Sequence, residues 1–218
     1  MPQVTSAEPQ KRKKDRFNIF LDGKYAFSLD TELFVKHRIR SGQILSQKNI
    51  DALLKESETS KLIDLALNFL SFRPRSQKEV EDYLTKKISQ RENIKFAQAK
   101  ESNLISDAIL KLKKYKYIND IEFAKWWVAS RGKSRPKGKL FVKIELLKKG
   151  VSKELIDEVL QKAGNQTNLA LRAVEKKLKN WQNLSRLEFK NKVYRYLVSR
   201  GFDFDEINKV VAELQKKR

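Results

Sequence analysis

The 218-residue chain contains no cysteine and only one histidine, His37. Without thiols it cannot form disulfides, Fe–S clusters, thiolate zinc sites or a cysteine nucleophile. A single imidazole cannot build a histidine-rich metal site, and a Ser-His-Asp triad would have to use His37. The glycines are too dispersed for a phosphate-binding loop. A hydrolase or nuclease would therefore lack an evident constellation of catalytic residues, and we expect no metal, cofactor or small-molecule substrate.

Long apolar runs and helix breakers are also scarce. No apolar run approaches the roughly 20 residues that a membrane span needs, and the N-terminal MPQVTSAEPQKRKK lacks the apolar core of a signal peptide. We therefore expect a cytoplasmic protein without a membrane span. Seven glycines and four prolines among 218 residues argue against a loop-rich β-protein, and a hydrophobic content of 40% argues against disorder. The composition favours a helical protein.

Positive charge is the component that the chain has in excess. Forty-eight Lys and Arg residues against 27 Asp and Glu give a formal net charge of +21. This imbalance is larger than solubility requires, so it predicts a polyanionic partner. Nucleic acid, an acidic membrane surface and an acidic protein all satisfy that description.

The N-terminal region changes character at residue 16. Residues 1–15 are polar and carry a basic cluster, which predicts a flexible basic tail. The next segment, RFNIFLDGKYAFSL, has two alternating runs separated by Asp22-Gly23, which is typical of a β-hairpin with a type I′ turn. An isolated hairpin is marginally stable, so its aromatic face should pack on helices downstream. Short helices are expected at 31–37 and 46–56, and the region should span 16–57.

Helical periodicity begins at residue 31 and continues to the C-terminus. An apolar helix over 62–70 should end before Arg73-Pro74, because proline disfavours helical geometry at the preceding residue. Three later helix starts have a capping pattern, in which a Ser or Asp and a Glu three residues on satisfy free backbone N–H groups. They lie at 76–79, 185–188 and 203–206.

The helical part contains an internal repeat. Residues 73–87 align without a gap to 135–149 at an offset of 62, and residues 142–160 align to 193–211 at an offset of 51. At the second offset Gly150 matches Gly201, and at both glycines a helix should end in a left-handed residue.

These alignments predict an all-α fold: an elongated tandem array of three three-helix repeats, preceded by the small β-hairpin and short helices. The expected repeats span 58–116, 117–165 and 166–218, with an insertion near 89–102 in the first. Each repeat should carry a buried apolar stripe, and Phe123 and Trp127, four residues apart on one apolar face, are assigned to the core.

Two motifs resemble those of a known family. The first repeat contains Phe72-Arg73-Pro74-Arg75-Ser76 with Glu79, Tyr83, Leu84 and Lys87. The second contains Tyr117-Ile118-Asn119-Asp120, Phe123-Ala124, Arg131, Arg135, Gly138, Glu145-Leu146 and Lys149-Gly150-Val151. With these motifs, residues 60–215 resemble the RecX family, bacterial regulatory proteins that restrain the RecA recombinase. Ile88 departs from the pattern, because the family has a helix-ending glycine there.

The resemblance implies a non-enzymatic inhibitor that binds the RecA–DNA filament along its groove. Such a protein opposes strand exchange, filament extension and the ATPase and co-protease activities of RecA, and so modulates DNA repair, recombination and the SOS response. Direct contact with single- or double-stranded DNA is also implied, and we expect a monomer. The alternative is a stand-alone DNA-binding protein whose hairpin acts as a wing beside a helix-turn-helix.

The window 131–149 is the most basic stretch, with eight Lys and Arg residues against one acid, Glu145. Glycine and proline should make part of it a loop, and a basic loop beside a helix start suits phosphate contacts. A solvated charged face is the alternative. The candidate partner- or DNA-binding residues are Arg131, Lys133, Arg135, Lys137, Lys139, Lys148 and Lys149, with Arg73, Arg75, Lys86 and Lys87 in the first repeat and Arg195 and Arg200 in the third.

Overall fold

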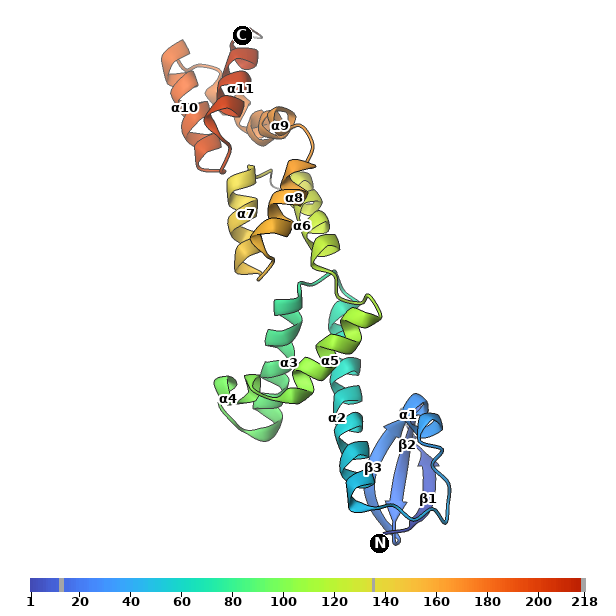
Figure 1. The fold of residues 1–218 in the computed structure, drawn as a ribbon. Helices are drawn as coiled ribbons and strands as arrows, with labels where there is room; N and C mark the ends of the chain where they lie inside the picture. Colours follow the sequence, from blue (N-terminus) through green and yellow to red (C-terminus); the bar gives the residue numbers. More distant parts are fainter. Residues whose placement is uncertain (12–13, 135, 217–218) are drawn as a thin grey trace. The chain divides into compact units, whose positions relative to one another are not determined.

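The structure is a computed structural model that describes residues 1–11, 14–134 and 136–216 (Figure 1). The strands are β1 (Val4–Pro9), β2 (Arg16–Leu21) and β3 (Lys24–Asp30). The helices are α1 (Thr31–Lys36), α2 (Gln47–Leu70), α3 (Gln77–Glu92), α4 (Phe96–Lys100), α5 (Asn103–Lys114), α6 (Asp120–Ser134), α7 (Lys139–Lys148), α8 (Lys153–Gln161), α9 (Gln166–Leu178), a 3-10 turn over Lys179–Trp181, α10 (Arg186–Val198) and α11 (Phe204–Lys216). The chain divides into two compact units: the first holds Met1–Arg73 and Val80–Tyr117, and the second holds Pro74–Glu79 and the chain from Ile118 on.

The predicted hairpin is confirmed as two strands of an antiparallel sheet in the order β1-β2-β3. At its turn, Asp22 has φ 48° and Gly23 has φ 79°. A type I′ turn requires positive φ at both central residues, and Asp-Gly is one of the pairs that tolerate this best. The local sequence therefore determines where β2 ends and β3 begins.

The flexible tail predicted over residues 1–15 is wrong for Val4–Pro9, which form β1. This segment pairs with β2, so that Ala7 lies opposite Ile19. On its other side the Val4 N–H donates to the carbonyl of Gln43, and the Val4 side chain is fully buried. The polar residues of β1 face solvent at the edge of the sheet, which is why the segment resembles a tail in the sequence.

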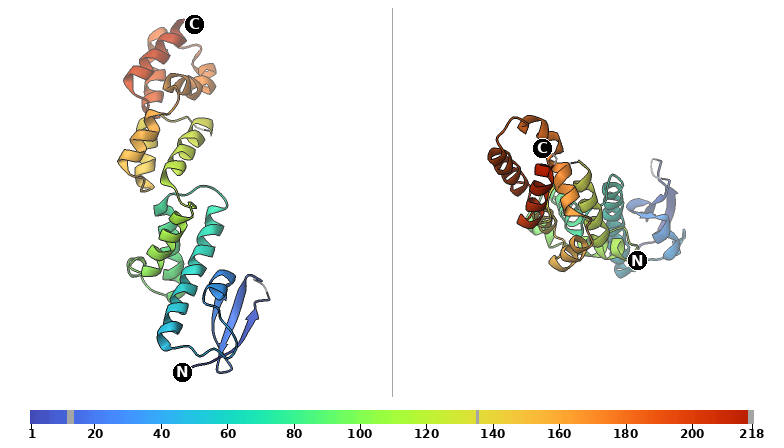
Figure 2. Two further views of the ribbon diagram at one scale, coloured as in Figure 1. Left: turned by 45° about the vertical axis from the view of Figure 1, so that its right-hand side comes forward. Right: turned by 90° about the horizontal axis from the view of Figure 1, so that it is seen from above.

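The sheet packs on α1 and on the N-terminal half of α2 (Figures 1 and 2). Phe27 and Leu29 from β3 are buried together with Leu33 of α1 and Leu53 of α2. The expected packing of the hairpin on downstream helices is therefore confirmed. Helix α1 also begins where predicted, because the Asp30 side chain accepts the N–H of Leu33 as its cap.

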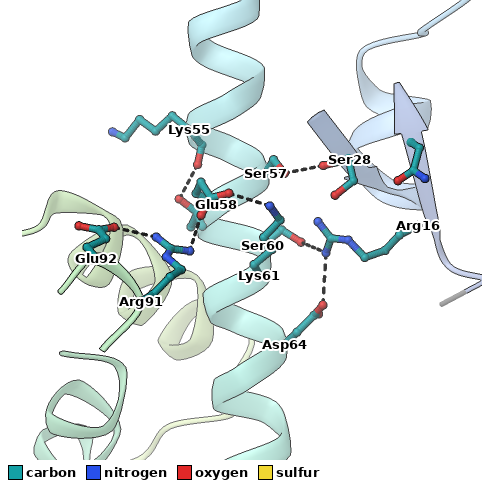
Figure 3. A network of polar contacts seen from close by, with 12 residues as sticks. Arg16, Ser28, Lys55, Ser57, Glu58, Ser60, Lys61, Asp64, Arg91 and Glu92 are labelled. Atoms are coloured by element: carbon teal, nitrogen blue, oxygen red, sulfur yellow. Dashed lines mark hydrogen bonds and ion pairs between the residues drawn. The ribbon is translucent and has the colours of Figure 1, made fainter. Parts of the chain in front are cut away.

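Helix α2 is one continuous helix of 24 residues, so the separate helices predicted at 46–56 and 62–70 are wrong. The boundary proposed between residues 57 and 58 therefore falls inside α2. Polar residues interrupt its apolar pattern, yet they are buried against the sheet (Figure 3). Ser57 donates to the carbonyl of Ser28, and Ser60 accepts a 3.3 Å hydrogen bond from Nη1 of Arg16, which is 3% exposed. A buried polar interface thus replaces the break that the sequence suggests.

The three predicted three-helix repeats are confirmed. The first repeat combines the C-terminal half of α2 with α3 and α5, where Phe69 and Tyr83 stack with ring centroids 4.1 Å apart. The second repeat is α6–α8, and the third is α9–α11. The segment 89–102 contains the last turn of α3 and the short helix α4.

The predicted helix ends are also confirmed. Gly150 has φ 79° and Gly201 has φ 80°, the left-handed geometry that a residue with a Cβ rarely adopts. Both halves of the capping box are present at Ser185 and Glu188. Ser76 and Glu79 make the same reciprocal bonds at the start of α3.

Within the second unit, the same contact joins repeats at two places. The Ser76 hydroxyl donates to the carbonyl of Lys149 at 2.7 Å, and the Gly138 N–H donates to the carbonyl of Arg200 at 2.9 Å. Ser76 and Gly138 are equivalent at the offset of 62, and Lys149 and Arg200 are equivalent at the offset of 51. Each helix-ending glycine turn therefore packs on the start of the second helix of the preceding repeat.

Candidate partner-binding surface

The basic window of the second repeat spans the end of α6, a short connection and α7. Arg131 and Lys133 lie in the last turn of α6, and Gly132 is part of the same helix. The expectation that a loop begins at this glycine is therefore wrong. Lys137 lies in the connection, and Lys139 begins α7. Arg135 lies outside the described residues.

Glu145 of α7 gathers three side chains from this window. Its Oε2 accepts a hydrogen bond from Nε of Arg131 at 2.7 Å and from Nε1 of Trp127 at 2.9 Å, and its Oε1 pairs with Nζ of Lys137. The Arg131 guanidinium also lies over the Trp127 ring, 4.4 Å from its centroid. Glu145, the one acid of the window, therefore compensates the charges of both Arg131 and Lys137.

The pKa of Glu145 lies below its usual value. Burial of the carboxylate acts to raise this pKa, but the hydrogen bonds from Lys137, Arg131 and Trp127 outweigh that effect. Because the hydrogen bonds favour the ionised form, the network joins α6 to α7 most strongly while Glu145 is charged.

The Glu145 network should make stability depend on pH. A carboxylate with a lowered folded-state pKa stabilises the fold above its unfolded value, about 4.3, and this contribution is lost as the pH falls through the folded pKa. Glu145→Gln should therefore unfold at a lower urea concentration than the parent at pH 7, and the difference should shrink in acid. Glu122→Gln is the control, since the side chains of Glu122 and its partner Lys125 are both more than half exposed. Equal pH profiles for the parent and Glu145→Gln would contradict this account.

Several other candidate cations also serve the internal structure of the repeats. Lys149 pairs with Glu79 at 2.5 Å and lies over Trp127. Lys87 lies over the ring of Tyr83, and Arg200 lies over the ring of Tyr196. Arg73 and Arg75 are half-buried and have partners of their own. The sequence could not reveal the pairing of Lys149, because Glu79 precedes it by 70 residues.

The remaining candidates are available to a partner. Lys86, Lys133, Lys148 and Arg195 are exposed, and Lys139 is half-buried. Among the residues that the structure describes, no carboxylate forms an ion pair with any of these five. Lys86 within α3 and Lys148 at the end of α7 take equivalent positions at the offset of 62. The cations that remain available are thus fewer than the sequence predicts: Lys86 in the first unit, and Lys133, Lys139, Lys148 and Arg195 in the second.

Within residues 1–11, 14–134 and 136–216, no group of three His, Asp or Glu side chains could hold a metal ion. No helix in the same ranges is long and apolar enough to cross a membrane.

The fold defines a class of protein built from a small N-terminal sheet and tandem three-helix domains, and comparison with known proteins identifies it. The RecX N-terminal domain matches residues 2–46. The first, second and third three-helix domains of RecX match residues 63–91, 119–160 and 165–211. The chain belongs to the RecX family.

Individual relatives agree with this assignment. The regulatory protein RecX of Bacillus subtilis (strain 168) is 37% identical over 99% of this chain and 78% of its own length. The regulatory protein RecX of Listeria monocytogenes serotype 4b is 31% identical over 96% of this chain and 74% of its own length. A crystal structure of regulatory protein RecX matches the fold with a TM-score of 0.74 at 24% identity, covering 96% of this chain and 98% of that one. A crystal structure of RecX from Lactobacillus salivarius matches with a TM-score of 0.61 at 29% identity, covering 72% of this chain and 97% of that one.

Proposed function

We propose that this protein regulates RecA by binding the RecA–DNA filament and inhibiting its recombinase, ATPase and co-protease activities. The observation that carries the proposal is the match of all four RecX domains, in order, along the chain. The curated relatives bear the name regulatory protein RecX, and regulation by binding needs no catalytic group. The protein would act in the cytoplasm, where it would modulate DNA repair, recombination and the SOS response.

The charge of the protein suits a long acidic partner. A net charge of +21 steers the protein toward a polyanion and raises its association rate, most strongly at low salt. Lys133, Lys139 and Lys148 in the second repeat are free of ion pairs to the described carboxylates, so their charges remain available to an acidic protein or to phosphate. Direct DNA contact is the second part of the proposal, and it would support rather than replace binding to RecA.

The alternative of a winged stand-alone DNA-binding protein has less support. A wing needs a hairpin that projects from the fold, but β2 is paired on both sides. Phe27 and Leu29 of β3 are buried against α1 and α2. A stand-alone DNA-binding protein would also act without RecA, and its affinity for duplex DNA would fall with salt by a log–log slope of about −0.9 per neutralised phosphate.

Replacing Lys133, Lys139 and Lys148 together by alanine tests the basic surface. We expect about tenfold more of this variant to be needed for half-inhibition of the DNA-dependent RecA ATPase, since truncating a few interface residues can remove that much binding. Stability should change little, because surface substitutions typically shift it by about 0.5 kcal/mol.

A matched triple variant separates position from net charge. Lys125, Lys153 and Lys162 lie in the same repeat and are exposed, and their replacement by alanine removes the same three charges. This control should inhibit RecA nearly as well as the parent. Equal losses in the two triples would show that only total charge matters and would contradict the proposed surface.

A further inference from the structure

We propose that the exposed face of α7 docks an acidic segment with apolar side chains from a partner protein. The identity of that protein as RecA rests on the function proposed above, whereas the docking face itself rests on α7. Its core consists of Leu140, Ile144 and Leu147, which we call the α7 apolar stripe.

The α7 apolar stripe lies on the side of the helix that faces away from the core. Leu140 is 59% exposed, Ile144 is 40% exposed and Leu147 is 45% exposed. Their spacing of four and three residues places them along one side of a helix. Val142 and Leu146 are buried on the other side. Helix α7 is therefore apolar on both faces, although only the face of Val142 and Leu146 is buried in the core.

The other two repeats show that this architecture does not require an apolar residue on that face. At the repeat offsets, the stripe corresponds to Lys78, Asp82 and Thr85 in α3 and to Asn191, Arg195 and Val198 in α10. Five of these six residues are polar, and of these five Thr85 is buried in the first repeat. Since exposed apolar groups that adjoin one another are typical of interaction sites, the stripe marks the second repeat as the one that contacts a protein.

Lysines at both ends of the stripe indicate the charge of the partner. Lys148 borders the stripe and Lys139 lies at the start of the same helix, and neither forms an ion pair with a described carboxylate, whereas Lys143 is already paired with Asp157 of α8. Glu145, the sole acid in α7, is already bound by Arg131 and Lys137. A partner segment that covers the stripe with apolar side chains would therefore place acidic side chains against this lysine rim.

A protein segment fits this surface better than a nucleic acid does. Phosphates could reach the lysines, but they would leave the aliphatic side chains between them without a partner. Proteins that bind single-stranded nucleic acid without sequence preference stack its bases on aromatic rings, which Leu and Ile cannot provide. The combination of an aliphatic centre and a basic rim is that of a protein–protein interface with a hydrophobic core.

The test replaces Leu140, Ile144 and Leu147 by glutamine, which keeps the net charge and the helix-forming character. Binding to a RecA filament on single-stranded DNA should weaken about tenfold or more, and binding to the same DNA without RecA should stay unchanged. The matched control replaces Leu110, Leu187 and Val198, exposed aliphatic residues of other helices, by glutamine and should bind the filament normally. Unchanged filament binding by the α7 triple, or an equal loss of DNA binding, would overturn the proposal.

A second measurement is independent of RecA. A synthetic amphipathic peptide with leucine on one face and glutamate beside it is titrated into the ¹⁵N-labelled protein. Shifts should concentrate in the amides of α7 and disappear in the α7 triple. Shifts elsewhere only, or stripe-dependent binding to phosphatidylglycerol vesicles instead of the peptide, would overturn the docking face. Failure of the parent to bind the RecA filament, with the peptide still bound at α7, would reject the proposed function alone.

Discussion

Gly138→Ala is expected to destabilise the protein by about 3 kcal/mol, the upper part of the usual range for overpacking. Gly138 precedes α7, and its N–H donates to the carbonyl of Arg200. A Cβ atom at this position would lie 2.0 Å from the carbonyl oxygen of Gly201, a distance that backbone atoms cannot accommodate without moving. The third repeat would have to shift away from α7 and lose this hydrogen bond. Urea unfolding followed by circular dichroism measures the effect.

The matched control for this prediction is Gly164→Ala. A Cβ at Gly164 meets no atom within 4 Å, and its backbone does not have a positive φ. This variant should unfold close to the parent, because only its backbone entropy changes. If Gly138→Ala unfolded at the same urea concentration as Gly164→Ala, the contact between the Gly201 turn and α7 would be wrong.

Leu146→Ala should lower the free energy of unfolding by about 2–5 kcal/mol, as expected for truncation of a core leucine. Leu146 is fully buried in the second repeat, among Phe123, Val142 and Ile156. Removing its branched end leaves a cavity that rigid neighbouring helices fill only in part. The thermal or urea unfolding midpoint reports the loss.

Its neighbour Leu147 offers the control for this truncation. Leu147→Ala removes the same atoms from a side chain that is 45% exposed, so it should cost much less stability. It should instead weaken filament binding, since Leu147 belongs to the α7 apolar stripe. Equal destabilisation by the two variants would show that the buried and exposed faces of α7 have been assigned wrongly.

Local signals in the sequence predicted the parts of the fold that depend on backbone conformation. Asp22-Gly23 identified the hairpin turn because both residues must take positive φ. Gly150 and Gly201 identified helix ends for the same reason. The alignments at offsets of 62 and 51 revealed the tandem repeats, and the Gly150 and Gly201 turns agree with the second of them. These features follow from a few neighbouring residues, so they can be predicted without knowledge of the tertiary contacts.

Features that depend on distant partners were not predictable in this way. The strand Val4–Pro9 is polar where it faces solvent, and its pairing with β2 gives no periodic signal of its own. The continuity of α2 depends on buried hydrogen bonds such as Ser57 to Ser28, which separate segments of the sequence do not reveal.

The sequence predicts how many positive charges the basic window carries, but not which of them are left unpaired in the folded protein. Glu145 binds Arg131 and Lys137 at once, so counting charges along the sequence overestimates the free positive charge. The exposed stripe on α7 was missed because a repeat alignment emphasises residues that agree between repeats. Leu140 and Ile144 stand out only when their exposure is compared with that of the polar residues at equivalent positions.

The central claim is that this protein acts by binding the RecA filament rather than by coating DNA. The most direct test titrates the protein into RecA on single-stranded DNA, at a salt concentration where its own binding to free DNA is weak, and measures ATP hydrolysis. The account predicts inhibition at far less than one molecule per RecA. Inhibition that appears only as the DNA becomes coated, with the same salt dependence as DNA binding, would contradict it.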